Sequence, residues 1–187
     1  MLTGWLGIAL PFLFFFFAAE KPLIVAHVRS GHAQLRQVGR LTVLELTAVG
    51  KPMRRAALTH PSDYSYGISA PYEAIVIAES PQHFLIFTDT LESNPGNVQG
   101  MCGASDQGER FVHVVSLEGI PHETLSVPVE SCLMLIEPGE RSPEWRAEPT
   151  TSGHGGELIL RYEDEPPTRY YVSSDGSVGR ARVGEAP

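Results

Sequence analysis

The sequence predicts an all-β protein, an antiparallel sandwich or barrel of about ten short strands in a single domain. Short runs rich in β-branched and aromatic residues alternate with turn residues along almost the whole chain, which contains 18 Gly and 15 Pro. Apolar residues hardly ever recur at helical spacing for three turns. Parallel βαβ units are therefore disfavoured, and the pattern is compatible with either an antiparallel sandwich or a barrel.

The N-terminal segment predicts export. Residues 1–19 carry no charged side chain and are too apolar for the surface of a small soluble domain, so we expect a signal peptide. A cut after Ala19 would place Phe17 at the third-last position, where a small residue is usual, and no Lys or Arg precedes the apolar run. An uncleaved membrane anchor is the alternative, since about 18 apolar residues can span a bilayer. The expected location is periplasmic or secreted, or anchored with the domain outside the cytoplasm.

Residues 20–183 are expected to form the single β domain, followed by a C-terminal tail at 184–187. The chain carries 14 Lys and Arg against 22 Asp and Glu, a formal net charge of −8. It has no run of basic residues, so it lacks the electrostatic footprint of a nucleic-acid-binding protein. The same charge suits a basic protein partner.

The first strands are expected before a Tyr-rich loop. Gly39-Arg40 separates two of them as a hairpin turn, and Gly50-Lys51-Pro52 ends that pair. The predicted strands are residues 23–28, 33–38, 41–49 and 53–59.

Two further strands are predicted at the centre of the sheet system. Residues 73–78 and 83–89 are joined by a connection of hairpin length and are apolar on both faces. A strand that is apolar on both faces is covered on two sides. A turn-rich loop, residues 90–108, follows.

The C-terminal half predicts a meander interrupted by one polar segment. Residues 133–136 extend the apolar run behind Cys132, and residues 137–156 are polar and rich in Pro and Gly. Asp175-Gly176 is a strong hairpin signal. The predicted strands are residues 111–117, 124–129, 157–162, 169–172 and 177–183.

The two cysteines predict one disulfide. An exported chain meets an oxidising compartment, and Cys102 and Cys132 are the only cysteines, so their pairing is forced. The bond would close a loop of about 30 residues and contribute about 3.5 kcal/mol of stability. A redox or zinc role is disfavoured because there is no Cys-x-x-Cys and no His at zinc-ligand spacing.

No sequence motif identifies an enzyme. Gly153-His154-Gly155-Gly156 is similar to the oxyanion loop of esterases, but no Gly-x-Ser-x-Gly elbow accompanies it. Paired carboxylates for glycoside hydrolysis would have to come together in space. The acids that border predicted strands, Glu73, Asp89, Glu92 and Glu109, are candidates, although surface charge is the simpler interpretation of each.

No motif identifies a metal or cofactor either. The seven histidines contain no His-x-His or His-Glu-x-x-His, and the chain has no EF-hand loop. We therefore expect no cofactor and assign no metal ligand. The acidic turn of Glu163, Asp164 and Glu165 could hold calcium weakly, but beside two prolines it more simply predicts a solvated tip.

A recognition loop is predicted around Cys102. Glycines flank the cysteine and allow close backbone approach, and a loop of fixed shape loses little ordering entropy on binding. Tyrosines are enriched at interfaces, although these could equally cover the end of the core. The candidate binding residues are Asn94, Asn97, Met101, Ser105 and Asp106 of the loop, together with Tyr64, Tyr66 and Tyr72.

The stretch Cys102-Gly103-Ala104, which precedes the strand expected from Arg110, resembles one in short exported proteins of Gram-negative bacteria whose roles are uncharacterised. The resemblance covers about twenty residues and implies periplasmic location. With the acidic charge and the loop, it favours a non-catalytic binding protein, such as an inhibitor, an immunity-type protein or an envelope interaction module. The alternative is a periplasmic hydrolase that acts on cell-wall or carbohydrate substrates through scattered carboxylates.

Overall fold

The computed structural model describes residues 22–28, 31–39, 41–60, 70–80, 82–92, 108–132, 134–148 and 155–180. The regular elements in these residues are all β-strands, and every strand pair is antiparallel, which confirms the all-β class. The strands are β1 (Leu23–Val28), β2 (Gly31–Val38), β3 (Leu41–Ala48), β4 (Arg54–Leu58), β5 (Glu73–Ser80), β6 (Phe84–Leu91), β7 (Glu109–Ser116), β8 (His122–Glu130), β9 (Glu144–Ala147), β10 (Gly156–Leu160), β11 (Thr168–Val172) and β12 (Val178–Arg180).

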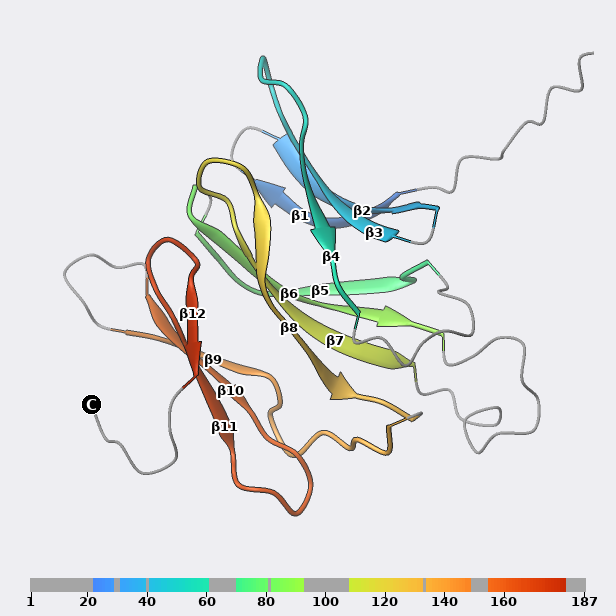
Figure 1. Ribbon diagram of the computed structural model, residues 1–187, viewed down its shortest axis with the longest axis vertical. Helices are drawn as coiled ribbons and strands as arrows, with labels where there is room; N and C mark the ends of the chain where they lie inside the picture. The colour runs from blue at the N-terminus through green and yellow to red at the C-terminus, as the bar shows by residue number, and fades with distance from the viewer. Residues whose placement is uncertain are drawn as a thin grey trace, which may run out of the picture.

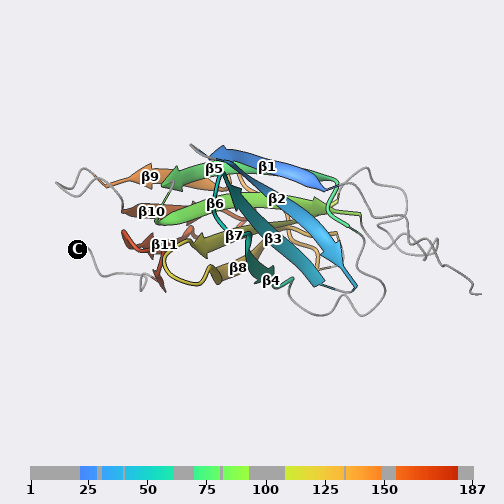
Figure 2. The ribbon, with the colours of Figure 1, turned by 90° about the horizontal axis from the view of Figure 1, so that it is seen from above.

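The described strands form three four-stranded sheets, in the orders β1-β2-β3-β4, β5-β6-β7-β8 and β12-β11-β10-β9. The expected single barrel, and a sandwich of two sheets, are therefore wrong, as is the expected number of about ten strands. Figure 1 shows the sheet of β5–β8 between the other two, and Figure 2, seen from above, shows β1–β4 lying over the central strands. The sequence pattern could not distinguish a third sheet, because antiparallel meanders give the same alternation in any of these architectures.

The central sheet packs on both faces. Leu85 and Phe87 of β6 join the core shared with β1–β4, whereas Phe84 and Ile86 join the core shared with β10 and β11. All eight residues of β6 are buried. Successive side chains of a strand point to opposite faces, so a strand that lies between two sheets buries the side chains of both faces. This confirms the prediction that residues 83–89 lie at the centre, covered on two sides. The same prediction for residues 73–78 is wrong, because β5 is the edge strand of its sheet and Ile75 is 49% exposed.

Two predicted hairpins are confirmed. β2 and β3 pair in register around Gly39, which has φ 64°, and β11 pairs with β12 around Gly176, which has φ 82°. Both glycines occupy the left-handed region that a residue with a side chain rarely adopts. The Asp175 carboxylate accepts a 2.9 Å hydrogen bond from the Ser177 amide and closes the second turn.

Two predictions in the C-terminal half are wrong. The polar segment 137–156 contains β9, which pairs with β10 through Trp145 opposite Leu158. The described part of the predicted apolar run 133–136, residues 134–136, does not continue a strand. The chain turns there, with a bridge between Ser131 and Ile136, and Leu135 is 74% exposed.

Several predicted features lie outside the described residues. They are the signal segment 1–19, the Tyr-rich loop at Tyr64 and Tyr66, and the tail 184–187. Among the residues that are described, no helix is long and apolar enough to cross a membrane. Cys132 is described and Cys102 is not, so the predicted disulfide stays a prediction.

Candidate functional site

The recognition-loop residues fall almost entirely outside the described ranges. Tyr72 is the one that the structure places, just before β5, where it is 50% exposed and its amide donates a 3.0 Å hydrogen bond to the Thr90 carbonyl. Partial burial, followed by the charge of Glu73, raises the pKa of its phenol. The other predicted recognition residues lie outside the described ranges: Tyr64, Tyr66, Asn94, Asn97, Met101, Ser105 and Asp106.

Of the four candidate acids, Asp89 lies within hydrogen-bonding distance of two histidines. Glu73 and Glu92 are exposed beside the ends of β5 and β6, and Glu109 is buried at the start of β7. Asp89 is buried in β6, opposite Phe111 of β7, on the face that packs against β1–β4.

A chain of polar side chains crosses this buried face. The two carboxylate oxygens of Asp89 lie 2.9 Å from His113 Nε2 and 2.9 Å from His60 Nε2. The other ring nitrogen of His113, Nδ1, lies 2.7 Å from Glu123 Oε1. The second oxygen of Glu123 accepts a 2.8 Å hydrogen bond from the Thr59 amide. We call His60, Asp89, His113 and Glu123 the buried cluster.

Strand pairing explains how the buried cluster forms. His113 of β7 pairs opposite Phe87 of β6, two residues from Asp89, so the two side chains share one face. Glu123 comes from β8, which pairs with β7. His60 follows β4, whose end is attached to β8 by hydrogen bonds from the Thr59 amide to Glu123 and from the Ser126 hydroxyl to the Thr59 carbonyl. The buried cluster thus joins the first sheet to the central one.

Burial and charge act in opposite directions on the central pair. Burial alone raises the pKa of the Asp89 carboxyl, but the adjacent His113 and His60 outweigh it and lower that pKa to about 2. Burial likewise favours the neutral form of His113, but Asp89 and Glu123 outweigh it and raise the pKa of His113 to about 9. At neutral pH the cluster therefore holds an imidazolium between two carboxylates.

Aromatic rings wall the buried cluster. Phe87 stacks on His113 with ring centroids 5.2 Å apart, and Phe111 meets His60 edge-on at 5.0 Å. The side chains of Asp89 and His113 are 0% exposed and that of His60 is 5% exposed. The electrostatic interactions of the cluster are therefore strong, because the surroundings have a low dielectric constant.

The sequence did not predict this cluster. His60 and Asp89 are 29 positions apart, and no ligand spacing connects them to His113. The available signal was a different one, since Asp89 and His113 interrupt runs that were expected to be buried. A charged residue in a buried strand requires a partner, so the two could have been searched for as a pair.

A second candidate is a surface pocket of about 390 Å³, which we call the acidic pocket. It is lined by Leu135, Ile136 and Glu137 from the segment after β8, and by residues 162–165 from the turn after β10. The two segments are joined by a 3.1 Å hydrogen bond from the Glu163 amide to the Glu137 carbonyl. Leu135 has φ 54°, a conformation that leucine rarely adopts, and such conformations concentrate at functional sites.

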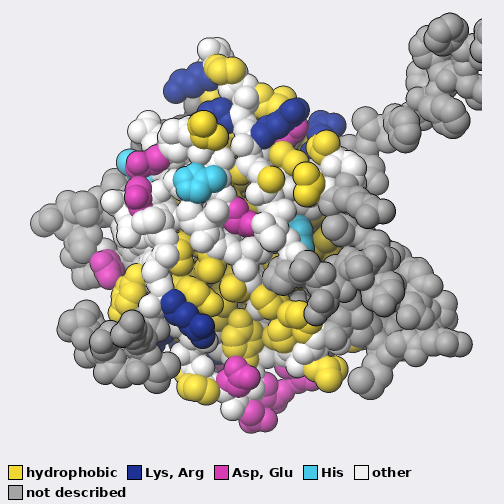
Figure 3. All heavy atoms as spheres, viewed as in Figure 1, with side chains coloured by type: hydrophobic (Ala, Val, Ile, Leu, Met, Phe, Trp, Pro, Cys, Tyr) yellow, Lys and Arg dark blue, Asp and Glu magenta, His cyan; other side chains and the backbone are white. Residues whose placement is uncertain are grey.

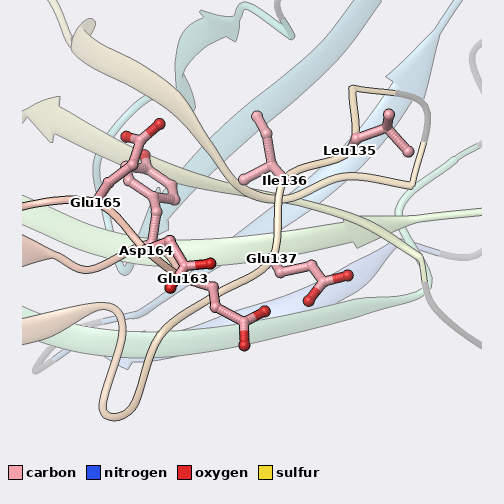
Figure 4. Close-up of a pocket in the computed structure, with 7 residues that line it drawn as sticks. Leu135, Ile136, Glu137, Glu163, Asp164 and Glu165 are labelled. Carbon is pink, nitrogen blue, oxygen red and sulfur yellow. The ribbon is translucent and has the colours of Figure 1, made fainter.

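The acidic pocket combines apolar and anionic groups. Figure 4 shows the carboxylates of Glu137 and Glu163 extending away from the side chains of Leu135 and Ile136. A hydrogen bond to Glu137, and then its charge, raise the pKa of Glu163. Tyr162 donates a 2.8 Å hydrogen bond to the Pro128 carbonyl, and burial raises the pKa of its phenol to about 12. The pocket therefore presents crowded negative charge beside a neutral wall.

Partly buried apolar side chains pack on the core shared with β10 and β11, as does Tyr162 of the acidic pocket. Four of these side chains are Leu125 and Val127 of β8, Tyr170 of β11 and Val178 of β12. Figure 3 shows hydrophobic side chains gathered on this face of the molecule, with acidic side chains at its lower end. We call these four residues the apolar strip.

No protein-family model matches this sequence, and comparisons with curated proteins and with solved structures found no match.

Proposed function

We propose that this protein is an exported, non-catalytic binding protein that recognises a basic protein partner. The observation that carries the proposal is the acidic pocket, in which Glu137, Glu163, Asp164 and Glu165 surround a concave space beside Leu135. A volume of about 390 Å³ lies within the range of pockets that bind ligands. A lysine or arginine side chain would bring positive charge to the carboxylates and lay its aliphatic stem on the apolar wall.

The electrostatics of the pocket support a cationic occupant. The pKa of Glu163 is raised first by a hydrogen bond between its carboxyl group and that of Glu137, and then by the repulsion between their charges. A cation between them would relieve that repulsion. The net charge of −8 would also accelerate association with a basic protein.

The surroundings of the pocket suit a protein partner. The apolar strip offers hydrophobic contact area, while the charged rim gives orientation, which is the usual anatomy of an interface. The three packed sheets hold both in place, so little ordering entropy would be lost on binding. The predicted recognition loop around Cys102, its disulfide to Cys132 and export by the N-terminal segment belong to the same proposal.

The test is binding of the full chain, in mild detergent, to a basic cell-wall hydrolase such as lysozyme. We expect an affinity that falls as salt rises, because exposed charges are screened. The double substitution Glu137→Lys and Glu163→Lys should weaken binding by at least about tenfold, equivalent to about 1.4 kcal/mol. Both glutamates are exposed, so the unfolding temperature should stay within about 2 °C of that of the unsubstituted chain.

The matched control is the double substitution Glu79→Lys on β5 and Glu148→Lys after β9, which makes the same change of charge at two exposed positions outside the pocket. It should leave the affinity within about twofold. Equal weakening by both variants would mean that only net charge matters, and it would contradict the role of the pocket. Failure of the unsubstituted chain to bind either the hydrolase or a lysine-rich peptide would contradict the proposed function itself.

The hydrolase alternative rests on the same carboxyl pair. A raised pKa at one of two adjacent acids, as for Glu163 beside Glu137, is typical of general acid catalysis. Two carboxyls within hydrogen-bonding range are closer than the roughly 5 Å that glycoside hydrolysis requires. Turnover of a cell-wall fragment that is lost in both Glu137→Gln and Glu163→Gln would favour this alternative.

A further inference from the structure

We propose that His60, Asp89 and His113 bind a divalent first-row transition metal ion, with Zn²⁺ as the expected ion. The donor atoms of these three side chains all lie within 4.8 Å of one another. Two imidazoles and one carboxylate form a ligand set that suits Zn²⁺ and its neighbours in the first transition row. This site is separate from the acidic pocket and goes beyond the proposed binding function.

The spacing of the three donor side chains is close to the spacing of ligands in a metal site. In a tetrahedral site with bonds of about 2.0–2.2 Å to nitrogen and oxygen, neighbouring ligand atoms lie about 3.3 Å apart. His60 Nε2 and His113 Nε2 each lie 2.9 Å from a different oxygen of Asp89. The two rings meet at 78°, with centroids 5.2 Å apart, and both present Nε2 to the Asp89 carboxylate. Small movements of the side chains would complete the geometry.

Glu123 holds the His113 ring in the orientation that a metal site needs. A metal-bound histidine almost always donates its other ring N–H to a carboxylate or a carbonyl, which fixes the ring and leaves the remaining nitrogen for the metal. His113 Nδ1 lies 2.7 Å from Glu123 Oε1, so Nε2 is the nitrogen left for an ion. Glu123 is itself held by the Thr59 amide at 2.8 Å.

Charge balance points the same way. Asp89 and Glu123 bring two carboxylates into a space walled by Phe87 and Phe111, and their ion-pair partners among the described residues are histidines alone. A dication coordinated by neutral imidazoles, formed when His113 releases its proton on metal binding, would balance both carboxylates.

The core shared with β10 and β11 consists of apolar side chains, joined by hydroxyl hydrogen bonds such as that from Ser116 to the Asp175 carbonyl, so a sheet can pack onto β5–β8 without a cluster like that of Asp89 and His113. The polar face is therefore not explained by packing. Buried ion pairs are often no more stabilising than well-packed apolar residues of similar volume. A ligand that uses these groups gives a reason for their presence.

The test uses the full chain in mild detergent, purified through an affinity tag that contains no histidine and stripped of metal with a chelator. Calorimetric titration with Zn²⁺ should show a single equivalent bound per chain, and the unfolding temperature should rise with the concentration of Zn²⁺. Co²⁺, used as a probe, should give the visible absorption bands of a tetrahedral ion with nitrogen and oxygen ligands.

His60→Gln separates a ligand from a structural hydrogen-bond donor. The glutamine amide can still donate to Asp89, so a purely structural role would be largely preserved, whereas a metal ligand would be lost. We expect the affinity for Zn²⁺ to fall at least about 100-fold and the Co²⁺ bands to disappear, with the metal-free protein still folded. Glu123→Gln, which changes the residue that orients His113, should weaken the binding of Zn²⁺ by roughly 10–100-fold.

The control is His27→Gln on β1, an exposed histidine outside the buried cluster. It should bind Zn²⁺ like the unsubstituted chain. The proposal is overturned if the unsubstituted chain takes up no stoichiometric Zn²⁺, or if His60→Gln and His27→Gln bind it equally. Neither outcome depends on whether the acidic pocket binds a basic partner.

Discussion

The two faces of the central sheet are filled in opposite ways. On the face toward β10 and β11, the central strands contribute apolar side chains that pack against Leu158 and Leu160 of β10. These side chains are Ile86, Val112 and Val114. Toward β1–β4, the same two central strands present apolar residues at one end and the buried cluster at the other. The same two strands therefore support an apolar core on one face of the sheet and a charged cluster on the other.

The difference shows what each layer requires. Burial of apolar side chains contributes about 25 cal/mol for each Å² removed from water and needs no particular orientation. A buried ion pair has to recover the cost of desolvation through exact geometry, and it fails if one partner is lost. Single changes of charge and changes of pH in the layer between β1–β4 and the central sheet should therefore alter the free energy of unfolding. In the core shared with β10 and β11, that free energy should depend mainly on side-chain volume.

The largest effect is expected for Asp89→Asn. The substitution keeps the shape of the side chain but leaves the His113 imidazolium with one carboxylate fewer, so we expect a loss of about 3–5 kcal/mol in the free energy of unfolding. Urea denaturation of the metal-free chain measures it. Asp175→Asn is the control, because this exposed turn residue makes the same chemical change and should cost less than about 1 kcal/mol. Equal losses in the two variants would contradict a special role for the buried pair.

The next effect is a loss of stability in alkaline solution. The pKa of His113 is raised from 6.5 to about 9 in the folded protein, so its stabilisation is fully present below pH 6.5 and is lost as the pH rises through 9. The pKa of Asp89 is lowered from 3.8 to about 2, so its stabilisation is present above pH 3.8 and is lost as the pH falls through 2.

Both shifts report the same interaction, which we count once, at roughly 3 kcal/mol. Stability of the metal-free chain should therefore be highest between about pH 4 and 6.5. Urea midpoints measured from pH 4 to pH 10 test this expectation, and the alkaline decline should flatten in Asp89→Asn. A decline of the same size in that variant would assign the pH dependence to other groups.

A smaller effect is expected in the apolar core. Ile86→Val removes one buried methylene from β6 and should cost about 0.5–1.5 kcal/mol. Because no titrating group faces Ile86 within the apolar cluster described here, the loss should be the same at pH 6 and at pH 9.5. A loss that changes with pH would show that the two layers are coupled through the central strands.

The sequence predicted those parts of the fold that depend on local pattern. The unbroken apolar character of residues 84–87 was enough to place β6 at the centre, and Gly39 and Asp175-Gly176 were enough to place two turns. The number of sheets was not predictable in this way, because stacking depends on how strands from distant parts of the chain face one another. β9 was missed because it is only four residues long, Glu144–Ala147, and lies within a polar segment rich in Pro and Gly, so that only its pairing with β10 identifies it as a strand.

The same distinction applies to the candidate sites. The acidic turn at residues 163–165 was visible in the sequence, but its pocket requires Glu137 from a segment that was expected to be a loop. The buried cluster depends on strand register, which places His113 opposite Phe87, and on the path of the chain after β4, which brings His60 to Asp89. A shift of one residue in that register would turn His113 to the other face of the sheet. Single-residue patterns carry no such information.

The smallest effect sharpens the comparison from outside both cores. Arg169 donates two 3.0 Å hydrogen bonds to the carboxylate of Glu157 across the β10–β11 pair, with the arginine side chain 46% exposed. Water and salt screen such a pair, so a double-mutant cycle with Arg169→Ala and Glu157→Ala should give a coupling energy of about 0.2–1 kcal/mol. The distances are as short as those around Asp89, so burial and not contact geometry would account for the larger cost expected at Asp89. A coupling energy above about 2 kcal/mol at this exposed pair would contradict that explanation.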